Sequence, residues 1–440
     1  MASPNRLTVL SNVIAEKTKV ISDFLASKGV EPPSFDVDGQ ADYAISADDK
    51  EAYEARLELI AASKELYALS HGPKDHIRNL CWDVGNITDV DVQAMDPLSL
   101  HAIWTFRVPQ AVPLNSKISY EDLAEKCHQL SGIFVPLFTF RRIIRHAITN
   151  RFFCEPELGF VAHNRASRVL LEEETLDAWV GLFCNDMWPG FVYTVEAMRR
   201  WPGSGEPNET GINVAYGHNL NWFDHTSRND VVADRYSKSM KAHGGGVGFD
   251  VSHTVTGYPW ADIGEGTVVD CGGSGGFASM AIAEAHPKLH FVVQDQEHTI
   301  TEETKAAVPQ HLKSRVRLEV HDLLKPQTVV ADVYFFRWVF HGFAEKYAIQ
   351  VLRALIPVLK KGAKVVINDG VIPDPGTVPW MEYRSIRCMD LLGMAVNNTG
   401  ERALDDWIGL FEAADPRFKF LNAWKPPKST IWFIEAEWQP

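Results

Sequence analysis

Short apolar runs alternate with longer helical segments throughout the second half of the chain. A β-branched run ends in Asp270, a glycine-rich turn follows at 272–276, and an alanine-rich run follows at 277–284. A second apolar run, 289–293, leads to Asp295. Short β-branched runs are typical of buried strands, and the alanine-rich run between them is typical of a helix. The stretch therefore predicts a strand, a tight turn, a helix and a second strand with an acid at its end.

The same alternation continues to the C-terminus. Further strands are predicted at 316–320, 329–336, 364–367, 418–422 and 429–437. Further helices are predicted at 347–359, 381–392 and 404–414. Alternating strands and helices indicate a doubly wound, Rossmann-like α/β domain. In such a domain the ligand binds at the C-terminal ends of the strands.

The first half of the chain has helical periodicity instead. Apolar residues recur at helical spacing over 7–26 and again over 49–69. The second helix is expected to end before the turn His71-Gly72-Pro73. Amphipathic helices of this kind need a partner for their apolar faces, either elsewhere in the chain or in a second subunit.

A pattern of three helices and a hairpin follows. Helices are predicted at 101–108, from 118–124 onward and at 136–149, and Ser119 is the expected N-cap of the second. A short hairpin is predicted over 151–162. This order outlines a winged helix, a fold that often binds DNA. The acidic total charge of the chain argues against that use, because phosphate contacts dominate DNA affinity.

The patterns divide the chain into four regions. Residues 176–260 are rich in aromatic side chains, among them Trp188, and this segment forms either the roof of an apolar substrate pocket or the core of a connector. The regions are an N-terminal helical region at 1–95, a winged-helix-like domain at 96–170, a helical connector and pocket roof at 171–260, and a cofactor-binding Rossmann-like domain at 261–440.

Composition limits the partners and the location. The formal charge of −14 argues against nucleic acid and against anionic membrane surfaces. No run of 18 apolar residues and no signal-peptide pattern is visible, so we expect a soluble, cytoplasmic protein without a membrane span. Six scattered cysteines without a CxxC pair suit reduced thiols. No group of residues has metal-ligand spacing, so no metal is expected.

The glycine turn is the first candidate site. Gly272 and Gly273 would let the backbone pass close to a bound cofactor, and Asp295 suits the two hydroxyl groups of a ribose. About 20 residues separate the turn from the acid, as in dinucleotide-binding folds. The spacing fits NAD, FAD or S-adenosylmethionine, and also an ordinary tight turn, so it does not select the cofactor.

Polar side chains gather where the predicted strands end. Six of them lie at or just after such ends: Asp270, Asp295, Asp322, Arg337, His341 and Asp369. His341 is the candidate general base, because histidine readily accepts a proton near neutral pH. Asp369 and Glu401 follow from later loops as acids that could orient it. His146 and His218 are weaker candidates for substrate contact, since a histidine on an apolar helix is more often a core residue.

An ordered set of motifs resembles those of the plant caffeate-type O-methyltransferases and their fungal secondary-metabolite relatives. The motifs are 270–276, 291–295, 321–323, 336–341, 361–369 and 406–411, with 142–150 resembling the recognition-helix stretch of the fungal branch. The resemblance runs from the winged helix to the C-terminus, and the ordered set is far more specific than any single motif.

This resemblance implies S-adenosylmethionine as the cofactor. It also implies a homodimer whose N-terminal helices interlock, so that 1–95 is a dimerisation region. By motif it places residues as follows: Gly272 and Gly273 near the methionine part, Asp295 at the ribose, Asp322 and Leu323 at the adenine, Asp270 beside the turn, and Arg337 at a basic cofactor contact.

The resemblance also implies the chemistry. His341 corresponds to the general base that takes the proton of the acceptor hydroxyl, and Asp369 and Glu401 correspond to the acids that flank it. The implied reaction is O-methylation of a hydrophobic, polyketide- or pyridone-like secondary metabolite, with no metal. Trp188, together with the two weaker histidines, is a candidate substrate contact.

Three departures from the family pattern stand out. Gly342-Phe343 follows the base where Asp or Asn and Trp are usual, Ser274 replaces the third glycine of the turn, and Asp369 replaces a commoner Glu. The same fungal branch includes pericyclases that keep the methyltransferase fold and catalyse dehydration, Diels–Alder, hetero-Diels–Alder or Alder-ene reactions without methyl transfer. The retained His341 favours methyl transfer, and the pericyclase is the alternative.

Overall fold

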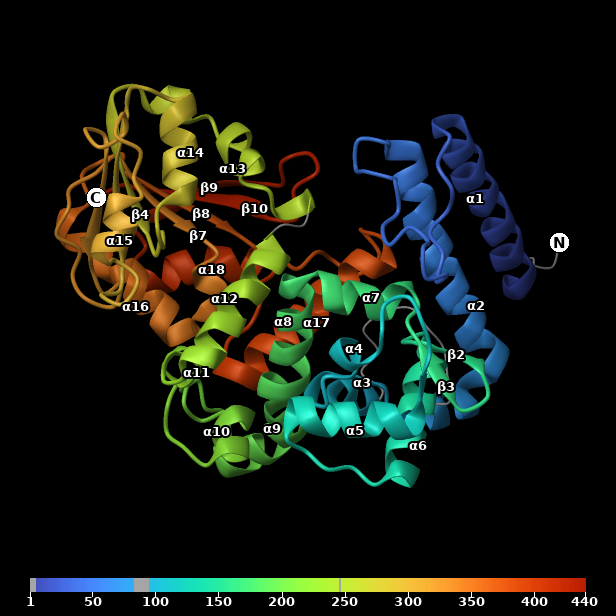
Figure 1. The fold of residues 1–440 in the computed structure, drawn as a ribbon. Coiled ribbons are helices and arrows are strands. Elements are labelled where there is room, and N and C mark those ends of the chain that lie inside the picture. Colours follow the sequence, from blue (N-terminus) through green and yellow to red (C-terminus); the bar gives the residue numbers. More distant parts are fainter. Residues whose placement is uncertain (1–4, 83–94, 245–246) are drawn as a thin grey trace. The chain divides into compact units, whose positions relative to one another are not determined.

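The computed structural model of the protein describes residues 5–82, 95–244 and 247–440 (Figure 1). The chain forms two compact units. The first combines Met1–Trp188 with Thr226–Ala242, and the second combines Pro189–His225 with His243–Pro440. Of the region predicted to dimerise, residues 1–4 and 83–94 lie outside the described residues.

A seven-stranded sheet is the centre of the second unit. Its strands are β4 (Gly266–Cys271), β5 (Leu289–Asp295), β6 (Val316–Val320), β7 (Val333–Arg337), β8 (Lys364–Asp369), β9 (Phe418–Trp424) and β10 (Trp432–Trp438). Their order is β6-β5-β4-β7-β8-β10-β9. The first five are parallel, and β10 pairs antiparallel with both β8 and β9. The chain proceeds outward from β4 to β6 and then returns to β7 beside β4, so the ends of β4 and β7 form the switch point where ligands bind in such folds.

Helices cover both faces of this sheet. They are α13 (Val251–Gly257), α14 (Phe277–Ala285), α16 (Glu345–Leu355) and α18 (Leu404–Ala414). The same unit also contains α15 (Glu302–Ala306) and α17 (Trp380–Asn397). Along β7, Tyr334 and Phe336 join the layer formed with α16 and α18, whereas Val333 and Phe335 join the opposite layer with α14. A parallel strand buried on both faces reads as a continuous apolar run, which is why β7 showed no alternation in the sequence.

Three helices that lie mostly in the same unit precede the sheet along the chain. They are α9 (Trp188–Arg200), α10 (Gly211–Tyr216) and α11 (Trp222–Ser227). α9 and α10 approach closely at Gly190 and Gly211, because a Cβ at Gly211 would lie 2.0 Å from the carbonyl oxygen of Gly190. The two glycines therefore set the distance between these helices.

The first unit begins with two long helices, α1 (Arg6–Lys28) and α2 (Lys50–Trp82). Ile21 and Leu25 of α1 pack against Ala52 and Ala55 of α2. The prediction that α2 ends before residue 71 was wrong, because the helix continues through Gly72-Pro73 to Trp82. A proline inside a helix removes one backbone hydrogen bond, but it does not always end the helix.

The rest of the first unit is helical with a small sheet. The helices are α3 (Met95–Thr105), α4 (Val108–Ala111), α5 (Tyr120–Ser131), α6 (Leu137–Thr149), α7 (Arg165–Glu172), α8 (Glu174–Gly181) and α12 (Asp230–Gly244). The sheet has the order β1-β3-β2, with strands Ile118–Ser119, Cys154–Glu157 and Phe160–Ala162. The expected N-cap is confirmed, since Ser119 Oγ accepts the N–H of Asp122 at 3.1 Å.

Several predicted boundaries in the second unit were wrong, among them the helix at 347–359, which is Glu345–Leu355, and the strand at 429–437, which is Trp432–Trp438. Two others have local reasons. α17 continues past Leu392 to Asn397, because Gly393 stays helical under Thr399, whose Oγ1 would lie 2.7 Å from a Cβ there. β7 begins at Val333 rather than Val329. The Tyr334 hydroxyl donates to the carbonyl oxygen of Val329 at 2.8 Å, and this bond holds residue 329 outside the sheet. Within the described residues, no helix is both long and apolar enough to cross a membrane.

The start of α14 gives a test of the glycine turn. Gly276 has φ +80° and its Cβ would lie 3.2 Å from Val293 Cγ2, whereas a Cβ at Gly275 would meet nothing within 4 Å. We expect Gly276→Ala to lower the free energy of unfolding by about 1–2 kcal/mol and Gly275→Ala by less than about 0.5 kcal/mol. Urea unfolding of both variants measures the difference, and equal effects would contradict the assigned backbone conformation.

Candidate active site

The glycine turn after β4 is fixed to the neighbouring strand. The N–H groups of Gly272 and Gly273 both donate to the carbonyl oxygen of Gln294, at 2.7 and 3.2 Å. A Cβ at Gly272 would lie 2.8 Å from Val339 Cγ2, and one at Gly273 would lie 2.5 Å from the carboxyl carbon of Asp270. Only glycine fits at these two positions, so the turn presents bare backbone at the end of β4.

Asp295 closes this turn from the end of β5. Its Oδ2 accepts the N–H of Ser274 at 2.8 Å, and its Oδ1 accepts the N–H of Gln296 at 2.7 Å. The side chain is half-buried. An ionised carboxylate has about four acceptor positions, so it keeps lone pairs for the hydroxyl groups of a ligand.

Asp270 and Arg337 lie deeper and have partners within the protein. Asp270 accepts a hydrogen bond from Ser279 Oγ at 2.6 Å, and its burial raises the pKa of the carboxyl to about 6. Arg337 donates from Nε to Thr254 Oγ1 at 3.1 Å and from Nη2 to the carbonyl of Phe249 at 2.9 Å. Burial lowers the pKa of this guanidinium, while Asp270 and other carboxylates oppose the shift. The side chains of Asp270 and Arg337 therefore bind protein groups next to the glycine turn and help to fix the structure around it.

The remaining predicted cofactor residues follow β6. Leu323 borders the glycine turn, since its Cδ1 would lie 3.6 Å from a Cβ at Gly272. Asp322 is exposed and accepts the N–H of Leu324 at 2.9 Å. In an adenosine-type cofactor, the bare backbone of the turn suits the amino acid part, the oriented acid Asp295 suits the ribose, and the apolar side chain of Leu323 suits the adenine.

His341 lies in a short 3₁₀ turn, Phe340–Gly342, just after β7. Its backbone N–H donates to Asp369 Oδ2 at 3.2 Å, and its ring Nδ1 lies 3.9 Å from Glu401 Oε1. Trp338 packs edge to face against the imidazole, with ring centroids 5.0 Å apart. The His341 side chain remains 33% exposed, so a ligand can reach it.

The carbonyl groups of this turn are also held. Arg402 donates from Nη1 to the carbonyl of Phe340 at 2.9 Å and from Nη2 to that of Phe343 at 2.8 Å. Asn397 Nδ2 donates to the carbonyl of Gly342 at 3.1 Å. The turn that carries His341 is therefore bound on both its N–H and its C=O groups, which orients the imidazole.

Glu401 is a buried acid beside other acids. Its side chain is 6% exposed, and its backbone N–H donates to Asp390 Oδ1 at 3.0 Å. Burial first, and then the charges of Asp369 and Asp390, raise the pKa of Glu401 to about 8. The carboxyl is therefore mostly protonated near neutral pH, and a positive charge on His341 would favour its ionised form.

The structure brings His341, Asp369 and Glu401 together as predicted. Sequence reasoning missed the part played by Arg402 and Asn397, although both lie in the same Asn-Asn-Thr-Gly-Glu-Arg segment as Glu401. A buried arginine must find carbonyl or carboxylate partners, but its burial is seen only in the structure. Trp338, with φ +55°, adopts a conformation that its sequence context did not indicate.

The three candidate substrate contacts belong to different units. His146 lies on α6 in the first unit, 3.9 Å from Asp96, and Trp188 ends the main segment of that unit. His218 lies in the second unit with its Nε2 2.6 Å from Nδ1 of His225. Among the described residues, no group of three or more His, Cys, Asp and Glu side chains could hold a metal ion.

Comparisons with known proteins extend these findings. A model of the O-methyltransferase domain matches residues 204–415. The chain is 33% identical over 438 residues to the grayanic acid biosynthesis cluster O-methyltransferase of Cladonia grayi, covering 99% of this chain and 88% of that protein. It is 33% identical over 448 residues to the chlorophenol O-methyltransferase of Trichoderma longibrachiatum, covering 99% and 91%. The crystal structure of OxaC in complex with SAH and oxaline has the same fold, with a TM-score of 0.70, 20% identity and coverage of 99% and 100%.

The sheet order and the glycine turn define a Rossmann-like domain that binds an adenosine-type cofactor. Together with relatives that align over nearly the whole chain, they show that the protein belongs to the fungal O-methyltransferases of secondary metabolism. It is an S-adenosylmethionine-dependent methyltransferase. The family assignment confirms the resemblance seen in the sequence and selects among the cofactors that the spacing left open.

The raised pKa of Glu401 predicts a pH-dependent stability. Between the ordinary glutamate pKa and about 8, the folded protein holds a proton that the unfolded chain releases, so stability falls as pH rises through this window. We expect the wild-type free energy of unfolding to fall by roughly 1–3 kcal/mol more than that of Glu401→Gln between about pH 5 and pH 8. Urea unfolding at several pH values measures this. Glu303→Gln, an exposed acid on α15, serves as control and should follow the wild type.

Proposed function

We propose that the protein methylates a phenolic or enolic hydroxyl of a hydrophobic, polyketide- or pyridone-like secondary metabolite, with His341 as the general base. The observation that carries the proposal is the position of His341. It is a partly exposed imidazole in a restrained turn at the switch point of the sheet, beside the buried carboxyls of Asp369 and Glu401.

The roles of these groups follow from their geometry. His341 Nδ1 faces Glu401, so Nε2 is the nitrogen left to take the proton of the acceptor hydroxyl. A positive charge on the imidazole lowers the pKa of Glu401, because opposite charges attract, and the ionised carboxylate in turn stabilises the imidazolium. Asp369 binds the backbone N–H of His341 and so holds the turn. The base and its acids thus make the hydroxyl oxygen a better nucleophile at neutral pH.

The cofactor residues fit one arrangement. Gly272 and Gly273 would lie along the methionine part, Asp295 would accept from the ribose hydroxyls, and Leu323 would contact the adenine, with Asp322 nearby. Arg337 and Asp270 would support the surrounding walls. When bound, S-adenosylmethionine supplies an electrophilic methyl group on a sulfonium.

The acceptor class has separate support. Trp338 places an aromatic ring beside His341, as apolar acceptor sites usually do. The chlorophenol O-methyltransferase, a relative covering most of the chain, supports a phenolic hydroxyl as acceptor. Trp188, His146 and His218 are proposed as further substrate contacts.

The domain organisation is part of the same proposal. We infer an N-terminal dimerisation region at 1–95, a winged-helix-like domain at 96–170, a connector and pocket roof at 171–260 and the catalytic domain at 261–440. Leu7 on α1 and Leu69 on α2 are 40% and 45% exposed, which favours a second subunit as cover. Light scattering after size exclusion tests the homodimer, and a monomeric mass at micromolar concentration would exclude it.

Substitution of the base separates chemistry from cofactor binding. His341→Ala is expected to lower kcat/KM for methylation by about 10²–10⁴-fold, because proton transfer in the transition state is lost. Its affinity for S-adenosylmethionine should stay within about twofold of the wild type, whereas Asp295→Asn should weaken that affinity by about tenfold with loss of a charged acceptor. Mass spectrometry on a panel of hydroxylated aromatics and pyridones, with calorimetry for the cofactor, measures both effects.

The control is His290→Ala, an exposed histidine on β5, which should leave both quantities unchanged. An isomerised or dehydrated product without an added methyl group would contradict the proposal. That outcome would favour a pericyclase that keeps the methyltransferase fold.

A further inference from the structure

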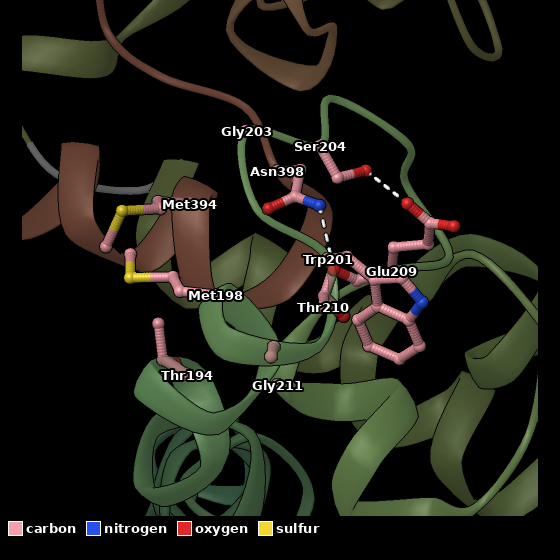
Figure 2. A pocket seen from close by; sticks show the side chains of 11 residues that line it. Thr194, Met198, Trp201, Gly203, Ser204, Glu209, Thr210, Gly211, Met394 and Asn398 are labelled. Carbon is pink, nitrogen blue, oxygen red and sulfur yellow. Dashed lines mark hydrogen bonds between the residues drawn. The ribbon is translucent and has the colours of Figure 1, made fainter.

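A cavity of about 220 Å³ lies in the second unit between α9, the loop 201–210, the start of α10 and the end of α17 (Figure 2). None of the residues that line this cavity is among those described around the glycine turn or His341. Met198 of α9 is 47% exposed at its edge, so the cavity opens to solvent there.

One part of the cavity wall is apolar. The thioethers of Met198 and Met394 lie beside one another from α9 and α17, and the indole of Trp201 lies on the other side (Figure 2). Methionine side chains adapt to differently shaped apolar groups and make favourable contacts with aromatic rings. A cavity of about 150 Å³ lined by apolar side chains can hold one benzene ring. This cavity is therefore large enough for a single substituted ring.

The polar part of the wall offers acceptors. Its hydroxyl and amide side chains already donate their hydrogens within the protein. Thr194 donates to the carbonyl of Gly190, Ser204 to the carboxylate of Glu209, Thr210 to Asn213 Oδ1, and Asn398 to the carbonyls of Glu206 and Glu209.

Two oxygens of this wall remain available. Within the part of the chain that the structure describes, neither Glu209 Oε1 nor Asn398 Oδ1 accepts a hydrogen bond. Both residues are half-buried, and neither oxygen is among the described buried side-chain atoms that lack a partner, so solvent reaches both. A ligand that carries a donor can replace water at these oxygens, and the negative charge of the Glu209 carboxylate strengthens that bond.

The end of α17 separates this cavity from the candidate active site. Asn397 reaches the carbonyl of Gly342 beside His341, whereas Met394 and Asn398, four residues apart, line the cavity. α17 ends at Asn397, and Asn398 is its left-handed C-cap. Neither His341 nor the residues that bind its turn line the cavity, so the two places have separate sets of lining residues.

We propose that this cavity is a second ligand site, distinct from the methyl-transfer site, for a single-ring aromatic molecule that carries a hydroxyl or ammonium donor. The ring packs between the two methionines and Trp201. The donor group binds Glu209 Oε1, with Asn398 Oδ1 as the second acceptor. The chain closes this site with the loop 203–210, which Glu206 ties to Tyr347 of α16 through a hydrogen bond of 2.6 Å.

Methyl NMR of the full-length protein tests this proposal. The protein is labelled at its methionine methyl groups, the signals of Met198 and Met394 are assigned by substitution to leucine, and Met240 of α12 serves as reference. Benzylamine, benzyl alcohol and toluene are titrated in turn into protein saturated with S-adenosylhomocysteine. We expect saturable shifts of both methyl signals with the two donors, and binding of toluene weaker than benzylamine by about tenfold.

Two variants identify the groups involved. Glu209→Gln should weaken the binding of benzylamine by about tenfold and leave that of toluene unchanged. Glu196→Gln, at a half-buried acid of α9 that does not line the cavity, should change neither. His341→Ala should bind all three probes as the wild type does, so the result does not depend on the methyl-transfer proposal.

Three results would overturn the inference. The first is the absence of shifts at both methionines. The second is equal binding of toluene and benzylamine that Glu209→Gln leaves unchanged, which would make the cavity a purely apolar void. The third is loss of probe binding in His341→Ala, which would make the cavity part of the acceptor site.

Discussion

A buried guanidinium and a buried carboxylate hold the turn that carries His341, and the rest of the site depends on this arrangement. Arg402 binds the carbonyl groups of Phe340 and Phe343, and Asp369 binds the N–H of His341. Burial of such charges is costly unless their hydrogen bonds are satisfied. Here the carbonyl groups, and the Trp407 ring 5.1 Å from the guanidinium carbon, provide partners for Arg402.

The sheet makes this arrangement possible. β7 and β8 pair in parallel with Arg337 opposite Asn368, so the turn after β7 and the acid at the end of β8 lie next to each other. A shift of one residue in this register would turn Asp369 to the opposite face of the sheet. The same ends also border the glycine turn, because Val339 contacts Gly272. Fold and candidate site are thus linked through the pairing of two strands.

Much of this could be predicted from sequence because the signals are local. Buried parallel strands read as apolar runs, the glycine turn requires glycine at 272 and 273, and each strand end carries one polar residue. His341, Asp369 and Glu401 could be proposed together because the ends of parallel strands share an edge. The role of Arg402 depends on contacts with residues about sixty positions away, which no local pattern shows. The extension of α17 past Gly393 likewise depends on Thr399 packing over the glycine.

α17 connects the two proposed sites. Its last turn presents Asn397 to the turn of His341 and Asn398 to the cavity beside α9, and Asn398 itself has φ +50°. A left-handed asparagine at a helix end is tolerated because its short polar side chain bonds nearby backbone. The segment from Asn398 to Glu401 is therefore short and held at both ends, since Glu401 binds Asp390 through its N–H. This loop therefore positions the buried carboxyl group of Glu401.

The most direct test of the central claim follows the methyl group itself. The protein is incubated with S-adenosylmethionine carrying a ¹³C-labelled methyl group and with hydroxylated aromatic and pyridone acceptors, and the products are examined by carbon NMR. The account predicts that the label appears in an aryl or enol methyl ether, and that its appearance depends on His341. Label that stays on the cofactor while the acceptor is isomerised or dehydrated, or label that appears on carbon or nitrogen, would contradict it.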